Sequence, residues 1–432
     1  MALSSHGTGS ETGASVGATV GSATGPAGSD SPVTPRPTRG LMTLLLVGNT
    51  AMYALYIGVA GVLLALQIED VDPANKVSNF GLVAGVSAIF ATVFNPVAGA
   101  LSDRSGRRNP WILGGGLLAL PVMFLLGSVH TILLVTIMWC LGQAVMNVYQ
   151  AAITSVVPDR IPVSARGKAS AAVGLGLPIG STVGALVGAA FSEDYRTGYL
   201  VFGAVVAAAA VLFTTCAREE RMPPKAPVPV KQQITAFGSA LKNRDFLWAF
   251  IGRALLMLGY FAIAVFQIYI LQDHTKLPEG LSPEGAIAIL TPIGSVAMVI
   301  ATVLGGWLSD RFDRRKLFVG ASAAITALSL VIPAVSTSWA AMTAFTIING
   351  IGFGCYMAVD TALVTMVLPK AEDAARDMGV LNVANAGPQI IAPFVASLVV
   401  SLSGGGYTAL FVVGAALSVL GALAVRPIRG VR

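Results

Sequence analysis

The chain has 432 residues, of which 55% are apolar and 11% are charged, and its formal charge at pH 7 is +6. A soluble domain usually carries about 25% charged residues, so this composition excludes an ordinary soluble protein and indicates repeated membrane crossing. The three cysteines, Cys140, Cys216 and Cys355, all fall in apolar segments, so we expect no disulfide framework.

Residues 1–39 are rich in small and polar residues and contain no apolar run, which predicts a disordered cytoplasmic tail without a secretory signal. Twelve apolar spans follow, each near the ~20 residues that a helix needs to cross about 30 Å of hydrocarbon. They cover approximately 40–68, 78–101, 111–129, 131–156, 168–191, 199–216, 246–271, 284–308, 316–334, 338–368, 378–402 and 406–426. Continuous apolar runs predict helices rather than a barrel, and hence an all-α membrane protein.

The longest polar break, 217–245, is rich in proline and divides the spans into two sets of six. It predicts a cytoplasmic linker between an N-terminal bundle (40–216) and a C-terminal bundle (246–426), followed by a short cytoplasmic tail (427–432). SDRSGRR at 102–108 returns as SDRFDRR at 309–315. Such parallel repeats predict two pseudo-symmetric bundles with a solute site between them at mid-depth.

Lys and Arg residues indicate how the chain is oriented in the membrane. Placing both termini in the cytoplasm puts all but four of the 27 basic residues on that side. The exceptions are Lys76, Arg196 and Lys276 in external loops and Arg253 within a span. Because basic loops favour the cytoplasmic side, we expect this orientation in the cell (plasma or inner) membrane.

Polar side chains form stripes on the first and fourth spans of each bundle. The stripes consist of Asn49, Tyr53, Tyr56 and Gln67; of Gln143, Asn147, Gln150 and Thr154; of Arg253, Tyr260 and Gln267; and of Asn349, Tyr356 and Asp360, with Asn382, Asn385 and Gln389 added on the eleventh span. Each residue alone is equally well explained as a link between neighbouring helices. Stripes on four equivalent helices favour one shared polar cavity that forms the substrate pathway.

Arg253 and Asp360 are the only charges placed well inside the hydrocarbon, about 10 and 12 Å from the inner ends of their spans at ~1.5 Å per residue. Equal depth predicts an ion pair between them. Asp360 would then serve as a proton acceptor or solute ligand influenced by Arg253. The alternatives are a permanent structural pair, or a carboxylate that braces Arg314 and Arg315.

The repeated charged loops predict a cytoplasmic gate. Carboxylates such as Asp103 can cap a helix, and arginines can pair with carboxylates across the seam between the bundles. The simpler alternative is retention of positive charge on the inner side. The candidate gate residues are Asp103, Arg104, Arg107, Arg108, Asp310, Arg311, Arg314 and Arg315, together with Arg166 and Arg376.

Motifs for other chemistry are missing. The sequence has neither GxxxxGK(S/T) for ATP nor the metal-binding patterns HExxH and CxxC…CxxC, so we expect no cofactor, no metal site and no enzyme. His6, His130 and His274 lie in the tail or in external loops and are not catalytic candidates.

GALSDRSGRR resembles the loop motif between helices 2 and 3 of the major facilitator superfamily, G-x-x-x-D-(R/K)-x-G-R-(R/K). The motif positions are filled by Gly99, Asp103, Arg104, Gly106, Arg107 and Arg108, and Asp313 replaces the glycine in the second copy. The resemblance covers about 40–426. It implies the twelve-helix major facilitator fold and alternating access by rocking of two bundles, with helices 1, 4, 7 and 10 lining the site.

RRNPWI, RGKASAAVGLG and DMGVLNVANAGPQIIAP resemble the glycoside and sucrose-type branch, which implies cation-coupled sugar uptake. The helix-5 motif of the efflux branch, G-P-x-x-G-G, is represented by Leu177-Pro178-Ile179-Gly180-Ser181, which keeps only the proline. We therefore expect a proton-coupled secondary transporter, with sugar-like uptake favoured over proton-driven efflux of drugs or metabolites, and over a sensor or scaffold without transport. Its expected partners are a small solute, protons and the lipid bilayer, with no nucleic acid, and we expect a monomer.

Overall fold

A computed structural model of the chain describes residues 40–162, 165–219, 221, 241–312, 314–367 and 374–428. Within this part, eleven helices are long and apolar enough to cross a membrane. The last helix, Thr408–Ala424, is apolar but has only 17 residues, fewer than the predicted span 406–426. With it, every predicted span corresponds to a helix, and the predicted fold class is confirmed. The predicted tail 1–39, most of the linker 217–245 and residues 429–432 lie outside the described residues.

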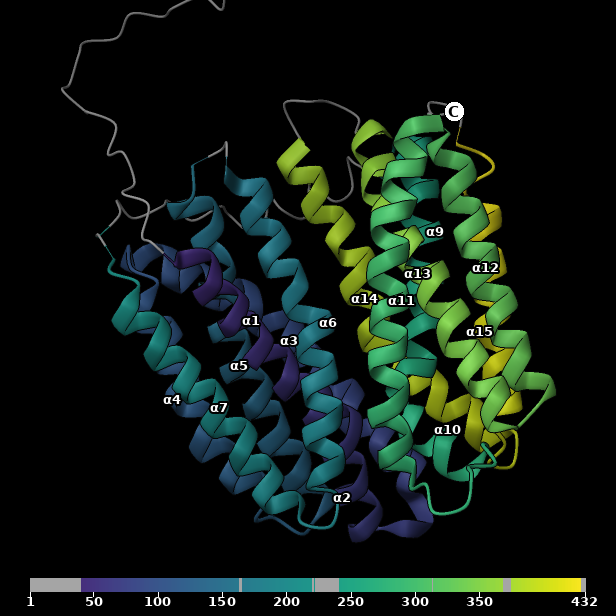
Figure 1. Cartoon of the computed structure of the whole chain (residues 1–432), viewed down its shortest axis with the longest axis horizontal. Coiled ribbons are helices and arrows are strands. Elements are labelled where there is room, and N and C mark those ends of the chain that lie inside the picture. The colour runs from purple at the N-terminus through teal and green to yellow at the C-terminus, as the bar shows by residue number, and fades with distance from the viewer. Residues whose placement is uncertain are drawn as a thin grey trace, which may run out of the picture. The chain divides into compact units, whose positions relative to one another are not determined.

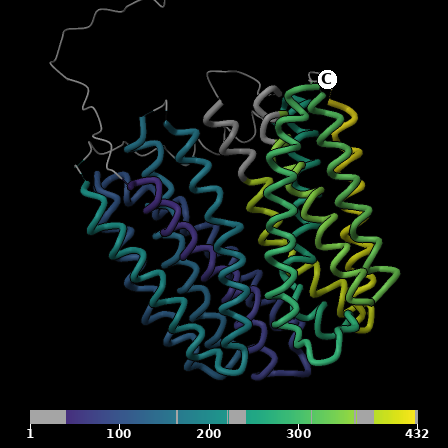
Figure 2. Tube along the Cα trace, in the orientation of Figure 1, coloured from purple at the N-terminus to yellow at the C-terminus, as the bar shows by residue number. Residues whose placement is uncertain are grey.

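The helices form two consecutive sets, and their bounds follow. The first half contains α1 (Leu41–Gly58), the π-helical segment η1 (Val59–Leu63), α2 (Leu64–Val71), the 3-10 turn η2 (Pro73–Asn75), α3 (Lys76–Ser105), α4 (Asn109–Leu126), α5 (Ile132–Arg160), α6 (Arg166–Ala190) and α7 (Tyr195–Cys216). The second half contains α9 (Arg244–Val265), α10 (Gln267–Asp273), α11 (Pro283–Phe312), α12 (Arg315–Val335), α13 (Trp339–Val367), α14 (Ala374–Leu402) and α15 (Thr408–Ala424). Figure 1 shows the first set in purple to teal and the second in green to yellow, and Figure 2 traces the same course.

Local sequence signals set several helix ends. The Asp194 side chain accepts the Thr197 backbone N–H at 3.2 Å and caps α7. Gly106 ends α3 in the left-handed region with φ of 65°. A residue with a Cβ is strained in that conformation, which explains the glycine in the charged loop motif.

Glycines on one face of α6 let this helix lie directly against α1. A Cβ at Gly180 would be 2.6 Å from the Thr50 carbonyl oxygen, and one at Gly184 would be 2.5 Å from the Ala54 carbonyl oxygen. Small residues four positions apart allow such close backbone approach in membrane helices. Gly176 and Gly180 lie against Asn49 and Tyr53, so α6 covers part of the polar stripe of α1.

The halves meet mainly through α3 with α14 and α6 with α11, and α10 adds contacts with the first half. Figure 1 has α2 and α10 at the bottom of the view and the C-terminal end at the top. We call these the distal end and the terminal end. The first and seventh spans are both interrupted on their way to the distal end, by η1 after Gly58 and by a break at Phe266 between α9 and α10. Interruptions of this kind, and π-helical turns in particular, are frequent at functional sites.

Candidate functional site

The two charged residues inside the spans form an ion pair in the second half. A guanidinium nitrogen of Arg253 on α9 lies 3.3 Å from Oδ2 of Asp360 on α13. The Arg253 Nε–H donates a 2.8 Å hydrogen bond to the Asn385 side-chain oxygen on α14. Tyr356, one turn before Asp360, hydrogen-bonds the same carboxylate. Arg253 and Asp360 are 6% and 3% exposed, so the expected ion pair is present, buried and held by three helices.

The Asp360 carboxylate keeps an unused acceptor. Its Oδ2 atom makes no hydrogen bond with any described group, although it lies within ion-pair distance of Arg253. Arg315, which the sequence offered as another partner, pairs with Asp310 at 3.0 Å. A buried carboxylate is costly unless it is fully paired. The Oδ2 atom can therefore take up a proton without displacing a hydrogen bond from a described group.

An aromatic stack lies on the same two helices. The Tyr260 and Phe353 rings are 3.8 Å apart between centroids with an interplanar angle of 10°. Tyr260 is two turns from Arg253 on α9, and Phe353 is two turns from Asp360 on α13. The sequence analysis missed Phe353, although its spacing of seven residues from Asp360 was the available signal. Together the four residues place a flat apolar surface beside a buried charge pair.

A second polar cluster lies in the first half. The side-chain oxygen of Asn147 on α5 accepts a 2.9 Å hydrogen bond from Asn95 on α3. Its Nδ2 atom lies 3.5 Å from the Tyr56 hydroxyl on α1 and also donates to the Gln143 carbonyl at 2.8 Å. Asn95 was not predicted, although an amide in the middle of the apolar span 78–101 was a signal. Across the described residues, no hydrogen bond or ion pair joins this cluster to the Arg253 cluster.

The other predicted pathway residues make fewer side-chain contacts. Tyr53, Gln150 and Gln267 are half-buried. Asn49 is buried and donates to a carbonyl one turn earlier in α1, while its side-chain oxygen has no partner in the described part of the chain. The side chain of Asn382 lies outside the described residues. These residues stay candidates for the pathway on position alone.

Two members of the predicted stripes join helices instead. Gln67 donates to the Leu126 carbonyl at 2.8 Å and accepts from the Tyr199 hydroxyl at 2.7 Å. Asn349 donates to the Ser329 hydroxyl on α12 at 3.1 Å. For these two residues the cavity prediction is wrong, because their polar groups are used in helix packing.

The predicted gate motif forms an ion-pair cluster within the first half. Arg108, which is 2% exposed, pairs with Asp159 at the end of α5 at 2.8 Å and with Asp103 in the last turn of α3. Arg104 and Arg107 are exposed. Among the described residues, no ion pair of this motif crosses the seam; the pair that joins the halves, Lys76–Asp273, lies at the distal end. We call the Arg108 contacts with Asp103 and Asp159 the Arg108 cluster.

Glu219, rather than Asp103, caps the start of α4. Its carboxylate accepts the backbone N–H groups of Arg108 and Asn109, the latter at 2.9 Å, and pairs with Arg160 at 2.6 Å. A carboxylate at a helix N-terminus is favoured by the free N–H groups and the helix dipole. The sequence analysis missed Glu219 because it lies in the polar linker, where its partners 110 positions earlier are not apparent.

The second copy of the motif is more loosely bonded. Besides the Asp310–Arg315 pair, Arg311 lies over the Trp307 ring at 5.3 Å, and Arg314 is exposed just before α12. Arg166 donates to the Pro158 carbonyl at 2.8 Å and closes the end of α5, so it acts within its own half. Asp313 and the Arg376 side chain lie outside the described residues.

A network at the distal end holds the halves together. Lys76 at the start of α3 lies 2.9 Å from Glu69 on α2 and 3.0 Å from Asp273 on α10. Gln272 donates to the same Glu69 at 2.7 Å. We call these four residues the distal network. Of these four residues, the sequence placed Lys76 in an external loop without predicting its partners; a single basic residue beside an acidic loop was the signal for a pairing role.

Aromatic packing continues the distal contact inward. The Tyr269 hydroxyl on α10 donates to the Ala65 carbonyl on α2 at 2.8 Å. The Phe80 ring on α3 packs edge-on against Phe266 and Tyr269, with centroids 5.4 and 5.5 Å away. Polar and apolar contacts thus close the same end of the bundle.

We expect Lys76→Gln to loosen the distal end, because it removes the charge that Glu69 and Asp273 share. A partly exposed ion pair contributes about 1 kcal/mol or less, and of the two pairs only Lys76–Asp273 joins the halves, so opening should become up to about fivefold easier. A cysteine introduced at Gln267, in a chain without its native cysteines, reports this as faster labelling by an impermeant maleimide. Lys276→Gln is the control, since that exposed lysine makes no described ion pair. Equal labelling rates in both variants would contradict the assignment.

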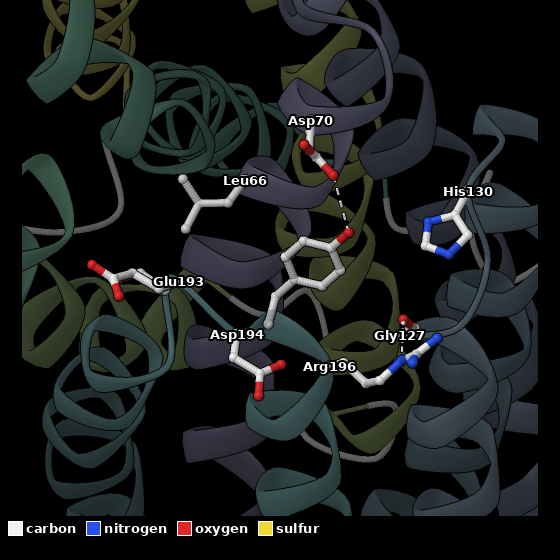
Figure 3. Close-up of a pocket in the computed structure, with 9 residues that line it drawn as sticks. Leu66, Asp70, Gly127, His130, Glu193, Asp194 and Arg196 are labelled. Atoms are coloured by element: carbon white, nitrogen blue, oxygen red, sulfur yellow. Dashed lines mark hydrogen bonds between the residues drawn. The ribbon is translucent and has the colours of Figure 1, made fainter.

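A polar pocket of about 560 Å³ lies within the first half at the distal end (Figure 3). The Tyr195 hydroxyl donates to Asp70 at 3.1 Å, and Arg196 donates to the Gly127 carbonyl at 3.4 Å. Hydrogen bonds from Thr197 lower the pKa of the Asp194 carboxyl. None of the residues lining this pocket belongs to the predicted pathway.

Comparison with known proteins agrees with this geometry. Residues 44–292 and 251–431 match the model of the Major Facilitator Superfamily. The chain is 26% identical over 302 residues to the multi-drug resistance efflux pump PmrA of Streptococcus pneumoniae serotype 4, covering 67% of this chain and 72% of that one. It is 25% identical over 267 residues to the multidrug resistance protein MdtG of Citrobacter koseri, covering 60% and 63%. Its fold is similar to the crystal structure of the nucleoside transporter NupG, with a TM-score of 0.75 at 15% identity over 90% of this chain and 99% of that one.

The chain has two helical halves with a buried polar cluster in each, and the Lys76–Asp273 ion pair joins the halves at one end. With the family match, this arrangement is that of a multi-pass membrane transporter of small solutes rather than an enzyme. The chain belongs to the Major Facilitator Superfamily of secondary transporters, as the resemblance of its loop motif implied.

Proposed function

We propose that the chain exports small organic compounds across the plasma membrane by alternating access, driven by protons. The observation that carries this proposal is the buried Arg253–Asp360 pair beside the Tyr260–Phe353 stack. An ionisable carboxylate inside a span is a natural place for a transported proton. Aromatic side chains suit apolar molecules that contain rings.

The names of two similar proteins support export as the direction of transport. PmrA is named a multi-drug resistance efflux pump and MdtG a multidrug resistance protein, whereas the segments that resemble the sucrose-type branch have no counterpart among these names. The efflux alternative therefore replaces sugar-like uptake as our main proposal.

The distribution of basic residues supports placing both termini in the cytoplasm, so the distal end faces outside. In that orientation the distal network closes the external side, and the Arg108 cluster holds only its own half at the inner side. We assign this arrangement to a state loaded from the cytoplasm. Tyr53, Tyr56, Gln143, Asn147 and Gln150 would line its first-half wall, and the charged loops would act as the inner gate in the opposite state.

Proteoliposomes with the inner face inside test the proposal. Loaded with an aromatic cationic dye, they should release it faster when the outside is made acidic, because protons then enter as dye leaves. Acid-driven entry of a sugar instead would reverse the assignment to uptake. Movement of neither compound class under any gradient would favour the sensor or scaffold alternative.

A further inference from the structure

A surface pocket of about 530 Å³ lies at the terminal end, between the start of α4 and the end of α7. Arg107, Pro110 and Leu113 line one side, and Thr214 and Arg218 line the other. None of these residues belongs to the buried polar clusters of the two halves. The pocket opens where two spans leave the membrane.

The charge of this pocket is positive. Its one carboxylate, Glu219, is already used by the α4 backbone N–H groups and by Arg160 at 2.6 Å. The Arg107 and Arg218 side chains are exposed, and neither makes an ion pair with a described carboxylate. Two guanidinium groups are therefore available to an anion.

The surface that continues from the pocket along α4 and α7 is apolar. Leu117, Leu118, Val211 and Leu212 are all exposed on these two helices. In a membrane-spanning chain such a surface faces lipid hydrocarbon. A ligand that fills the pocket can therefore carry acyl chains along these helices.

The equivalent place in the second half is filled by the chain itself. Between the start of α12 and the end of α15, the Lys316 ammonium group donates to the carbonyl oxygens of Arg426 at 2.8 Å and Ile428 at 2.5 Å. The open basic pocket is thus a feature of the first half, and it does not follow from the internal repeat.

We propose that this pocket binds the phosphate of an anionic membrane lipid headgroup, with the acyl chains lying along α4 and α7. Guanidinium groups match phosphate geometry and bind it through paired hydrogen bonds. Basic pockets between helices at the membrane surface recognise anionic headgroups. The site is independent of the proposed direction and substrate of transport. Because Arg107 precedes Arg108, the bound lipid also braces the loop that carries the Arg108 cluster.

Native mass spectrometry of the purified full chain with phosphatidylglycerol tests this site. Removing both charges, in Arg107→Gln/Arg218→Gln, should weaken retention of the tightest-bound lipid roughly thirtyfold, since each basic residue contributes ~1 kcal/mol near an anionic surface. Lys168→Gln/Arg244→Gln is the matched control, because it removes two exposed charges near the terminal end outside the pocket. It should retain the lipid as the unaltered chain does.

Arg107→Lys/Arg218→Lys separates charge from folding. This variant keeps both charges, and it should retain more lipid than the glutamine variant at equal thermal stability. Equal retention in all variants would overturn the proposal. Displacement of the lipid by millimolar inorganic phosphate would overturn the assignment to a lipid, since a free anion would then suffice.

Discussion

Asp360→Asn is expected to reduce pH-gradient-driven transport to the level of protein-free liposomes while leaving exchange of solute for solute. Asparagine keeps the shape of the side chain and can still accept from Tyr356, but it cannot take up and release a proton. Asp360 is the one acidic residue placed well inside the spans, and its Oδ2 lacks a hydrogen bond among the described groups. If protons drive the cycle, this carboxylate is the expected carrier, since an ionisable group within a span marks a proton path.

Dye release from proteoliposomes under an imposed pH gradient measures the first effect, and counterflow of labelled dye measures the second. Glu279→Gln is the control, because that carboxylate is exposed in the segment between α10 and α11 and belongs to neither the polar clusters nor the charged loops. It should transport normally. Gradient-driven release by Asp360→Asn at the rate of the unaltered chain would refute proton coupling through this residue.

Loss of the carboxylate also leaves Arg253 buried without its counter-ion. Breaking one partner out of a buried pair costs about 3–5 kcal/mol, so Asp360→Asn is expected to be less stable. Arg253→Gln/Asp360→Asn removes both charges and should recover part of that loss. It should remain uncoupled, which distinguishes a missing proton site from a misfolded protein.

Counting residues from the inner ends of their spans predicted the Arg253–Asp360 pair, because both residues lie on apolar helices with a constant rise per residue. Helical periodicity failed at Gln67 and Asn349. It gives the face on which a residue lies but not which neighbouring helix takes up its polar atoms. Gln67 reaches the end of α4, some sixty positions away, and no local pattern encodes that contact.

The residues that sequence reasoning missed make contacts over long separations. Lys76 pairs with Asp273, and Glu219 caps a helix that begins at Asn109. In both cases one partner lies in a polar loop or linker. Hydropathy does not predict which way a side chain points in such a segment. The internal repeat did not help, because the second half fills the corresponding place with Lys316.

Replacing Arg108 by alanine is expected to destabilise the chain by about 3–5 kcal/mol, the cost of breaking buried ion pairs on one side. Arg108 forms ion pairs with Asp159 and Asp103 and donates a hydrogen bond to the Ser102 hydroxyl. The Asp159 side chain is only 4% exposed. With the arginine gone, Asp159 loses its described ion-pair partner. Arg108→Lys should recover only part of the loss, because an ammonium group lacks the fixed fork that reaches several acceptors.

Thermal unfolding of the purified chain measures this difference, and Arg104→Ala is the control. Arg104 lies four residues earlier in the same motif but is exposed, so its loss should change the free energy of unfolding by about 0.5 kcal/mol or less. The contrast separates two roles of one charged motif. If the motif only kept positive charge at the inner surface, Arg104 and Arg108 would be equivalent. Equal stability of the two variants would therefore support that simpler alternative. A large loss of unfolding free energy in Arg108→Ala alone would show that the buried contacts of Arg108 with α3 and α5 stabilise the chain. Arg108 would then be the residue of the motif with the structural role.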